Sequence, residues 1–162
     1  MNYVEYTTKA PTLLEPSSFY EVGKLTVFTD YQPDDHSWKP AFREMIVLLD
    51  DMLAKSEQAG NRIGFTEQVG VNGKEQDITS LVKWMRENMV GKNVGSDPGI
   101  NQRLNRYKNA GAGYFANGAF FSCDYEDEIA FFLDDQRIYL NRHIHRAILE
   151  VQAHKAPSNP VQ

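Results

Sequence analysis

The chain has 162 residues, of which 41% are hydrophobic, and a chain of this size can bury one core without disulfides or metals. Its formal net charge of −5 argues against nucleic-acid binding through phosphate contacts and favours a basic protein partner. The only cysteine cannot form an internal disulfide, and no apolar stretch approaches the roughly 20 residues that span a bilayer, so we expect a cytoplasmic protein with no membrane partner.

The first expected elements are a strand over residues 23–30 and a long helix near residues 40–59, with Pro40 in its first turn. The strand is predicted by its alternation of apolar and polar residues. Ser37 or Asp35 would cap the start of the helix, and Gly60 would end it. The helix is predicted because apolar residues recur at intervals of three and four: Phe42, Met45, Ile46, Leu49, Met52 and Leu53.

An extended segment is predicted over residues 62–76, with a tight turn at Asn72-Gly73. Asp77 then stands at the N-cap position of a second helix, and Gly91 would end that helix. Its apolar face would consist of Ile78, Leu81, Val82, Met85 and Met89.

A third, short helix is predicted over residues 96–109, because Asp97 followed by Pro98 is typical of a cap and a first helical residue. Its buried face would hold Ile100, Leu104 and Tyr107. Its exposed face would hold Arg103, Arg106 and Lys108.

The aromatic segment YFANGAFFSCDYEDEIAFFLDDQRIYLN is predicted to form a meander of short antiparallel strands. Helical spacing returns after Asn141, a preferred N-cap residue, and residues 156–162 are expected to be a disordered tail. The turns of the meander would be Asn117-Gly118, Glu126-Asp127 and Asp134-Asp135.

These elements predict one α+β domain over residues 1–162, with its core in about 20–155. The fold would be an antiparallel β-meander packed against three or four helices. Most of the sheet would come from residues 112–141, and the helices near 40–59 and 77–90 would cover one of its faces.

The motif NRHIHR, residues 141–146, is the first candidate for chemistry, because two histidines between two arginines could bind a metal or a phosphate. On a strand His143 and His145 would share a face, as a pair of metal ligands must. On a helix they would lie roughly 200° apart around the axis and could not bind one metal together. We favour the helix, with one surface histidine and one partly buried, and we expect no metal, cofactor or catalytic residue.

Cys123 and the adjacent pair Asp34 and Asp35 could be catalytic, but a structural role is preferred for each. Cys123 lies among acidic and aromatic residues, which disfavour a reactive thiolate, and is interpreted as a small core residue. Asp34 and Asp35, next to His36, fit a turn better than a pair of catalytic carboxylates.

One segment departs from an ordinary surface. Between Ser122 and Gln136 the chain carries six carboxylates and no Lys or Arg, a local charge of −6 in a protein of −5. These residues are either solvated turns or a surface that docks on a basic partner, with Tyr125 and Tyr139 supplying contact area. The partner-binding set predicted in this segment is Asp124, Tyr125, Glu126, Asp127, Glu128, Asp134 and Asp135.

The order of elements resembles that of immunity proteins of bacterial polymorphic toxin systems. The resemblance is carried by an N-terminal strand, a helix with FREMIVLLDDMLAK, a second with ITSLVKWMREN, the strand GAGYFANGAFFSC and an acidic hairpin, over about residues 24–140. It is a likeness of pattern and transfers no catalytic residue. It implies an inhibitor that neutralises one cognate toxin.

Three functions are therefore expected, in order of preference. The first is a non-enzymatic inhibitor of the immunity type that binds a basic toxin or nuclease domain through the acidic segment. The second is a small metal- or histidine-dependent hydrolase or nuclease that uses His36, His143 or His145. The third is a structural component of a phage or secretion apparatus, which would expose apolar patches and oligomerise.

Overall fold

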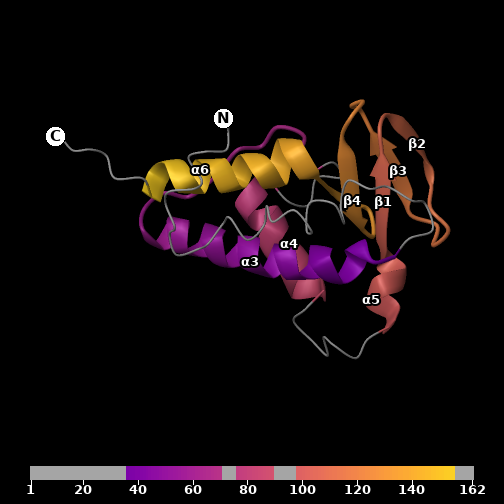
Figure 1. The fold of residues 1–162 in the computed structure, drawn as a ribbon, viewed down its shortest axis with the longest axis horizontal. Coiled ribbons are helices and arrows are strands. Elements are labelled where there is room, and N and C mark those ends of the chain that lie inside the picture. Colours follow the sequence, from indigo (N-terminus) through magenta and orange to yellow (C-terminus); the bar gives the residue numbers. More distant parts are fainter. Residues whose placement is uncertain (1–35, 71–75, 90–97, 156–162) are drawn as a thin grey trace.

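The computed structural model describes residues 36–70, 76–89 and 98–155 of the chain. The predicted strand at 23–30, the turn at Asn72-Gly73, the helix end at Gly91 and the tail lie outside these residues. The described elements are α3 (Trp38–Gln58), α4 (Ile78–Met89), α5 (Pro98–Arg103), β1 (Leu104–Lys108), β2 (Gly111–Tyr114), β3 (Phe120–Cys123), β4 (Ile129–Leu133), β5 (Gln136–Tyr139), the π-helix η3 (Leu140–His145) and α6 (Arg146–Lys155) (Figure 1). The predicted α+β fold class is confirmed.

Helix α3 buries the apolar face that its spacing predicts. It begins at Trp38, so Ser37 occupies the N-cap position as predicted, although its side chain makes no capping hydrogen bond. The predicted stop is confirmed, because Gly60 has a φ of +92°, a conformation that glycine adopts without steric cost.

Helix α4 begins where the sequence predicts, immediately after Asp77. A side-chain oxygen of Asp77 accepts a hydrogen bond of 2.9 Å from the backbone N–H of Ser80, the arrangement of an N-cap. The guanidinium of Arg62 binds both carboxylate oxygens of Asp77 at 3.0 Å. This ion pair joins the start of α4 to the segment that follows α3.

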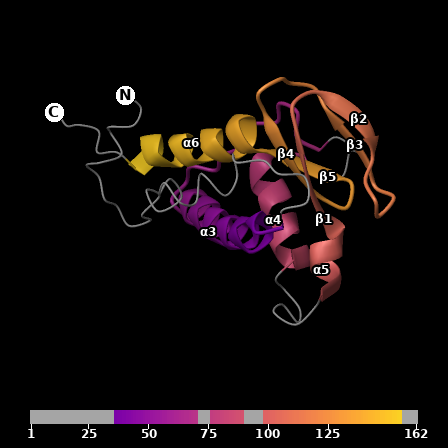
Figure 2. The ribbon, with the colours of Figure 1, turned by 45° about the vertical axis from the view of Figure 1, so that its right-hand side comes forward.

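The strands form two sheets rather than one continuous meander. One sheet has the order β1-β4-β5 and the other is the hairpin β2-β3, and all pairings are antiparallel. Helices α3, α4 and α6 pack on one face of the three-stranded sheet, and the hairpin lies beyond its other side (Figures 1 and 2). Strand β4 is buried throughout because both of its faces are covered.

The two faces of β4 have different neighbours. Phe131 belongs to the core shared with the helices, and its ring stacks on Phe42 of α3 at a centroid distance of 4.6 Å. Phe132 belongs to a second core with the hairpin, where its ring contacts Phe121 at 6.2 Å. The expected helical cover of one face is therefore present, and the hairpin covers the other.

The third predicted helix, 96–109, is wrong in its second half. Helix α5 ends at Arg103, and the residues that follow form β1. Strand β1 pairs antiparallel with β4, and Leu104 lies opposite Leu133. Leu104 faces the helical core while Tyr107 packs on the hairpin, so the two residues predicted to share a helical face lie on opposite faces of a strand. Pairing with a buried central strand outweighs a short stretch of local helical spacing.

The predicted turns are present at all three positions in the aromatic segment. Asp127 and Asp134 have positive φ angles of 61° and 55°, which Asp tolerates better than most residues. The final helix is also present, but its first turns are the π-helix η3, and Tyr139 rather than Asn141 occupies the N-cap position. The predicted N-cap role of Asn141 is therefore wrong.

Candidate interaction site

The acidic segment is divided by β4 into two separate turns. Asp124, Glu126 and Asp127 are exposed in the β3–β4 turn and are called the acidic turn here. Asp134 and Asp135 lie in the β4–β5 turn, at the other end of a five-residue strand. At about 3.3 Å per residue the two turns are roughly 17 Å apart, so the segment does not form one compact acidic patch.

Glu128 is not available to a partner, because its side chain is 0% exposed. One carboxylate oxygen accepts hydrogen bonds from the backbone N–H of Ile129 and of Asn141, at 3.0 and 3.1 Å. The other accepts from the backbone N–H of Arg142 at 3.0 Å and from its guanidinium at 3.2 Å. Glu128 therefore caps the final helix, and its predicted place on a partner-binding surface is corrected.

Asp134 is accessible but already neutralised. The guanidinium of Arg103 binds its carboxylate at 2.6 and 3.0 Å, and the backbone N–H of Asp134 donates to the carbonyl of Arg103. This pair closes the β4–β5 turn onto the end of α5. Of the two acidic residues in this turn, Asp135 is the more exposed.

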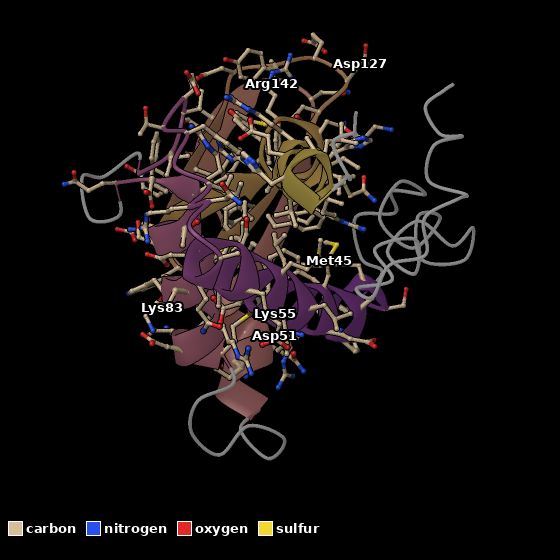
Figure 3. The ribbon with its side chains drawn as sticks, turned by 90° about the vertical axis from the view of Figure 1, so that its left-hand side faces the viewer. Met45, Asp51, Lys55, Lys83, Asp127 and Arg142 are labelled. Carbon is tan, nitrogen blue, oxygen red and sulfur yellow. The ribbon has the colours of Figure 1, made fainter. Side chains whose placement is uncertain are left out.

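The backbone of the acidic turn is hydrogen bonded to two neighbouring side chains. The backbone N–H of Asp127 donates to the side-chain oxygen of Asn109 at 3.1 Å, and that of Asp124 donates to the hydroxyl of Tyr139. Figure 3 shows Asp127 at the end of the molecule that also carries Arg142, far from Lys83. In the part of the chain that the structure describes, no carboxylate of the acidic turn makes an ion pair.

The two tyrosines near the acidic turn have different roles. Tyr125 is half-buried, and the guanidinium of Arg142 lies 3.6 Å from its ring centroid. Tyr139 is fully buried, burial raises the pKa of its hydroxyl, and its ring lies against that of Tyr125 at 5.5 Å. Only Tyr125 can contribute contact area at the surface.

The motif NRHIHR is helical, as favoured, and its histidines lie in different surroundings. His143 is fully buried, more than expected, and burial lowers its pKa to about 4. Its Nδ1 accepts from the backbone N–H of Tyr139 at 2.9 Å, so Nε2 carries the proton and donates to the carbonyl of Glu67 at 3.0 Å. His145 is half-buried, and burial lowers its pKa as well.

The arginines of the motif are also in structural contacts. Arg142 is bound to Glu128, and Arg146 binds Glu67 and Glu150 at 2.9 and 2.8 Å. Within residues 36–70, 76–89 and 98–155 no three His, Cys, Asp or Glu side chains gather as a group that could hold a metal. His36 lies at the start of α3, in the wall of a pocket, while the buried His143 is bound to Glu67.

Cys123 is a buried residue of the smaller core, between the hairpin and the three-stranded sheet. Burial raises the pKa of its thiol, which keeps it protonated at neutral pH. The interpretation of Cys123 as a core residue is confirmed.

A pocket of about 370 Å³ lies between the start of α3, strand β1 and the hairpin, and sequence reasoning did not find it. Its basic lining residues are His36, Lys39 and Arg106. The sequence predicts Arg106 on the exposed face of a helix. In the structure it is 7% exposed and lies over the ring of Trp38 at 5.1 Å. The aromatic richness of residues 107–121 was visible in the sequence, whereas its position next to α3 depends on the fold.

The described elements define an α+β protein with a rigid acidic turn at one end and a basic, aromatic pocket at the other. None of the described helices combines the length and the apolar composition that a membrane span requires. Comparison of the chain with protein-family models, with curated proteins and with solved structures gave no match.

Proposed function

We propose that the protein is a cytoplasmic, non-enzymatic inhibitor of the immunity type that binds a basic toxin or nuclease domain through its acidic turn. The observation that carries the proposal is the state of three carboxylates: those of Asp124, Glu126 and Asp127 are exposed and engaged in no ion pair of the described chain, on a turn whose backbone is hydrogen bonded at positions 124 and 127.

The proposed binding set is smaller than the one predicted from the sequence. Glu128 is left out because it is buried beneath the turn, and Asp134 because it is bound to Arg103 at the other end of β4. Tyr125 stays in the set, because its half-buried ring lies next to the turn. A rigid turn loses little conformational entropy on binding, and unpaired carboxylates give up no intramolecular partner when they meet a cation.

The first test is whether a neighbouring gene encodes a toxin domain, and the second is a binding measurement with that domain. Replacing the carboxylates by Asp124→Asn, Glu126→Gln and Asp127→Asn should slow association and flatten its dependence on salt. The reason is that the Debye length falls from about 10 Å at 0.1 M salt to about 3 Å at 1 M, which screens the steering charges. Asn is suited to position 127 because it tolerates the positive φ found there.

A matched control removes the same charge elsewhere, through Glu57→Gln, Glu67→Gln and Glu87→Gln. The side chains of these residues are 47%, 71% and 59% exposed and make surface ion pairs of small energetic value. Stopped-flow association rates from 0.05 to 0.5 M NaCl, with thermal melts of each variant, decide the question. Equal association rates for the two folded triple variants would contradict the proposal.

A structural component of a phage or secretion apparatus, the third function expected from the sequence, is the alternative that a specific observation favours, because the hairpin exposes an aromatic pair. Tyr114 and Phe120 are 74% and 51% exposed, and their rings meet edge to face at 5.4 Å. Sedimentation velocity should show a self-association that Phe120→Ser abolishes if this candidate is correct. A monomer at all concentrations would count against it.

A further inference from the structure

The pocket and the acidic turn lie at opposite ends of the three-stranded sheet. Lys108 and Asn109, at the end of β1, are next to the acidic turn, whereas the pocket is lined by the earlier residues 104–107. The far side of the pocket is formed by residues 114–116 at the end of β2. A ligand in the pocket would therefore leave the acidic turn free.

The charges that line the pocket have the opposite sign to the charge of the whole chain. Lys39 and Arg106 both lie over the ring of Trp38, at 5.9 and 5.1 Å from its centroid, and His36 stands at the rim. Among the described residues no Asp or Glu lines the pocket, although the chain carries 22 of them. Two cations beside one apolar ring create a positive potential in a partly desolvated place, which favours an anion.

The walls of the pocket are aromatic. The ring of Phe121 lies against those of Tyr107 and Phe115, each at a centroid distance of 4.4 Å, on the hairpin side of β1, and Trp38 lines the pocket from the α3 side. Tyr114, which is 74% exposed, stands at the mouth. The exposed ring of Tyr114 offers a face to a planar ligand, because stacked and edge-to-face contacts between rings add to the burial of apolar area.

The side-chain amide nitrogen of Asn105, a residue that lines the pocket, is buried and finds no acceptor within the described chain. A buried donor without an acceptor destabilises the fold, so an acceptor supplied by a ligand would be favourable. This observation is independent of the charges, and it indicates a ligand that carries oxygen atoms.

We propose that this pocket binds a small planar aromatic anion, with its ring against the exposed ring of Tyr114 and its charged group near Lys39 and Arg106. The volume of about 370 Å³ is at the small end of ligand pockets and suits one or two fused rings with a single anionic group. A carboxylate and a phosphate monoester both meet these requirements, since both bring oxygen acceptors and negative charge to a guanidinium. This site is separate from the proposed protein-binding function and does not depend on it.

The experiment uses two anion and neutral pairs with the full-length chain. Naphthalene-2-carboxylate is compared with naphthalene-2-carboxamide, and adenosine 5′-monophosphate with adenosine, by titration of ¹H–¹⁵N spectra. We expect at least one anion to bind about tenfold more tightly than its neutral counterpart, a difference of about 1.4 kcal/mol. The perturbed signals should map to β1, β2 and the start of α3, and the tighter pair identifies a carboxylate or a phosphate as the charged group.

Two substitutions in the pocket and one matched control complete the test. Lys39→Gln should weaken anion binding about fivefold and leave neutral binding unchanged, and Tyr114→Ala should weaken both. The control Lys83→Gln removes an equal charge on α4, outside the pocket, and should leave both affinities as they are. Neither substitution in the pocket removes a fully buried side chain, so both variants should stay folded.

Equal affinities for anions and neutral counterparts would overturn the proposal. So would signals that map outside the pocket, or an equal loss of affinity in the Lys83→Gln control. A failure here would leave the salt dependence of partner association at the acidic turn unaffected, because the two sites share no residue.

Discussion

The carboxylate of Glu128 lies 3.2 Å from the guanidinium of Arg142, and together they join the acidic turn to the first turn of the final helix. Glu128 is fully buried while the side chain of Arg142 is 45% exposed, so only the arginine of this ion pair contacts solvent. The same carboxylate also accepts the backbone N–H groups of Asn141 and Arg142, which have no acceptor within the helix itself. One side chain thus anchors β4, η3 and the acidic turn.

Glu128→Ala should lower the free energy of unfolding by about 2–3 kcal/mol, because charge-assisted hydrogen bonds to buried N–H groups are lost. Glu126→Ala, two residues earlier and exposed, is the matched control and should change stability by less than about 0.5 kcal/mol. Urea unfolding followed by circular dichroism measures both. Equal small effects would show that Glu128 is not the cap of the helix.

The roles of the individual acidic residues could not be predicted from the sequence. Six acidic residues between positions 122 and 136 look alike in the sequence, yet one is a buried cap and another is bound to an arginine. The difference depends on partners 13 to 31 residues away, Asn141 for Glu128 and Arg103 for Asp134. Local composition found the acidic segment but did not separate its exposed carboxylates from those with a structural role.

Long amphipathic helices were predictable because α3 and α4 repeat their apolar spacing over several turns. Strand β1 was not, because five residues of mixed character can follow either period, and its pairing with β4 spans the inserted hairpin. The pocket was missed for the same reason. Trp38 and Phe121 face it from distant parts of the chain, and no local pattern joins them.

The buried His143 should make stability fall in mildly acidic solution. Its pKa is about 4 in the folded protein and about 6.5 when exposed, so between these values the unfolded chain binds a proton that the folded protein does not. Stability therefore falls as pH drops through 6.5 and stops falling from this cause below about 4. The full effect is on the order of 3 kcal/mol.

The measurement is the free energy of unfolding at pH 7.5, 5.5 and 4.5 for the wild type and for His143→Gln. The variant should be less stable at pH 7.5, because two hydrogen bonds are altered, and should show a shallower pH dependence. His154→Gln, at an exposed position of α6, should keep the slope of the wild type. Identical slopes for all three proteins would refute the prediction.

The apolar face of α3 allows a direct test of the main core. Ile46 and Leu49 are both 0% exposed, so truncating either to Ala should destabilise the protein by about 2–5 kcal/mol through lost burial and a cavity. Leu48, on the same helix but 37% exposed, is the control, and Leu48→Ala should cost less than about 1 kcal/mol. Similar urea midpoints for Leu48→Ala and Leu49→Ala would show that this face is not the core.

The close approach of Gly111 to Tyr107 predicts an effect of a single added methyl group. A Cβ at position 111 would lie 2.9 Å from the ring carbon that bears the tyrosine hydroxyl, and nearer still to the hydroxyl oxygen. The ring cannot easily withdraw, because its other neighbour is Phe121 at 4.4 Å. Gly111→Ala should therefore destabilise the protein by about 1–3 kcal/mol, the usual range for overpacking.

The cause can be separated from a general effect of replacing a glycine by alanine. Gly64→Ala places its Cβ at 3.5 Å from the nearest atom, an ordinary contact, and should change stability by less than about 1 kcal/mol. Tyr107→Leu removes the ring that the methyl group would meet, so the double variant with Gly111→Ala should lose less stability than the two single variants added together. Strict additivity in this cycle would place the cost of Gly111→Ala in the backbone of β2, and the packing of the hairpin on Tyr107 would not be its source.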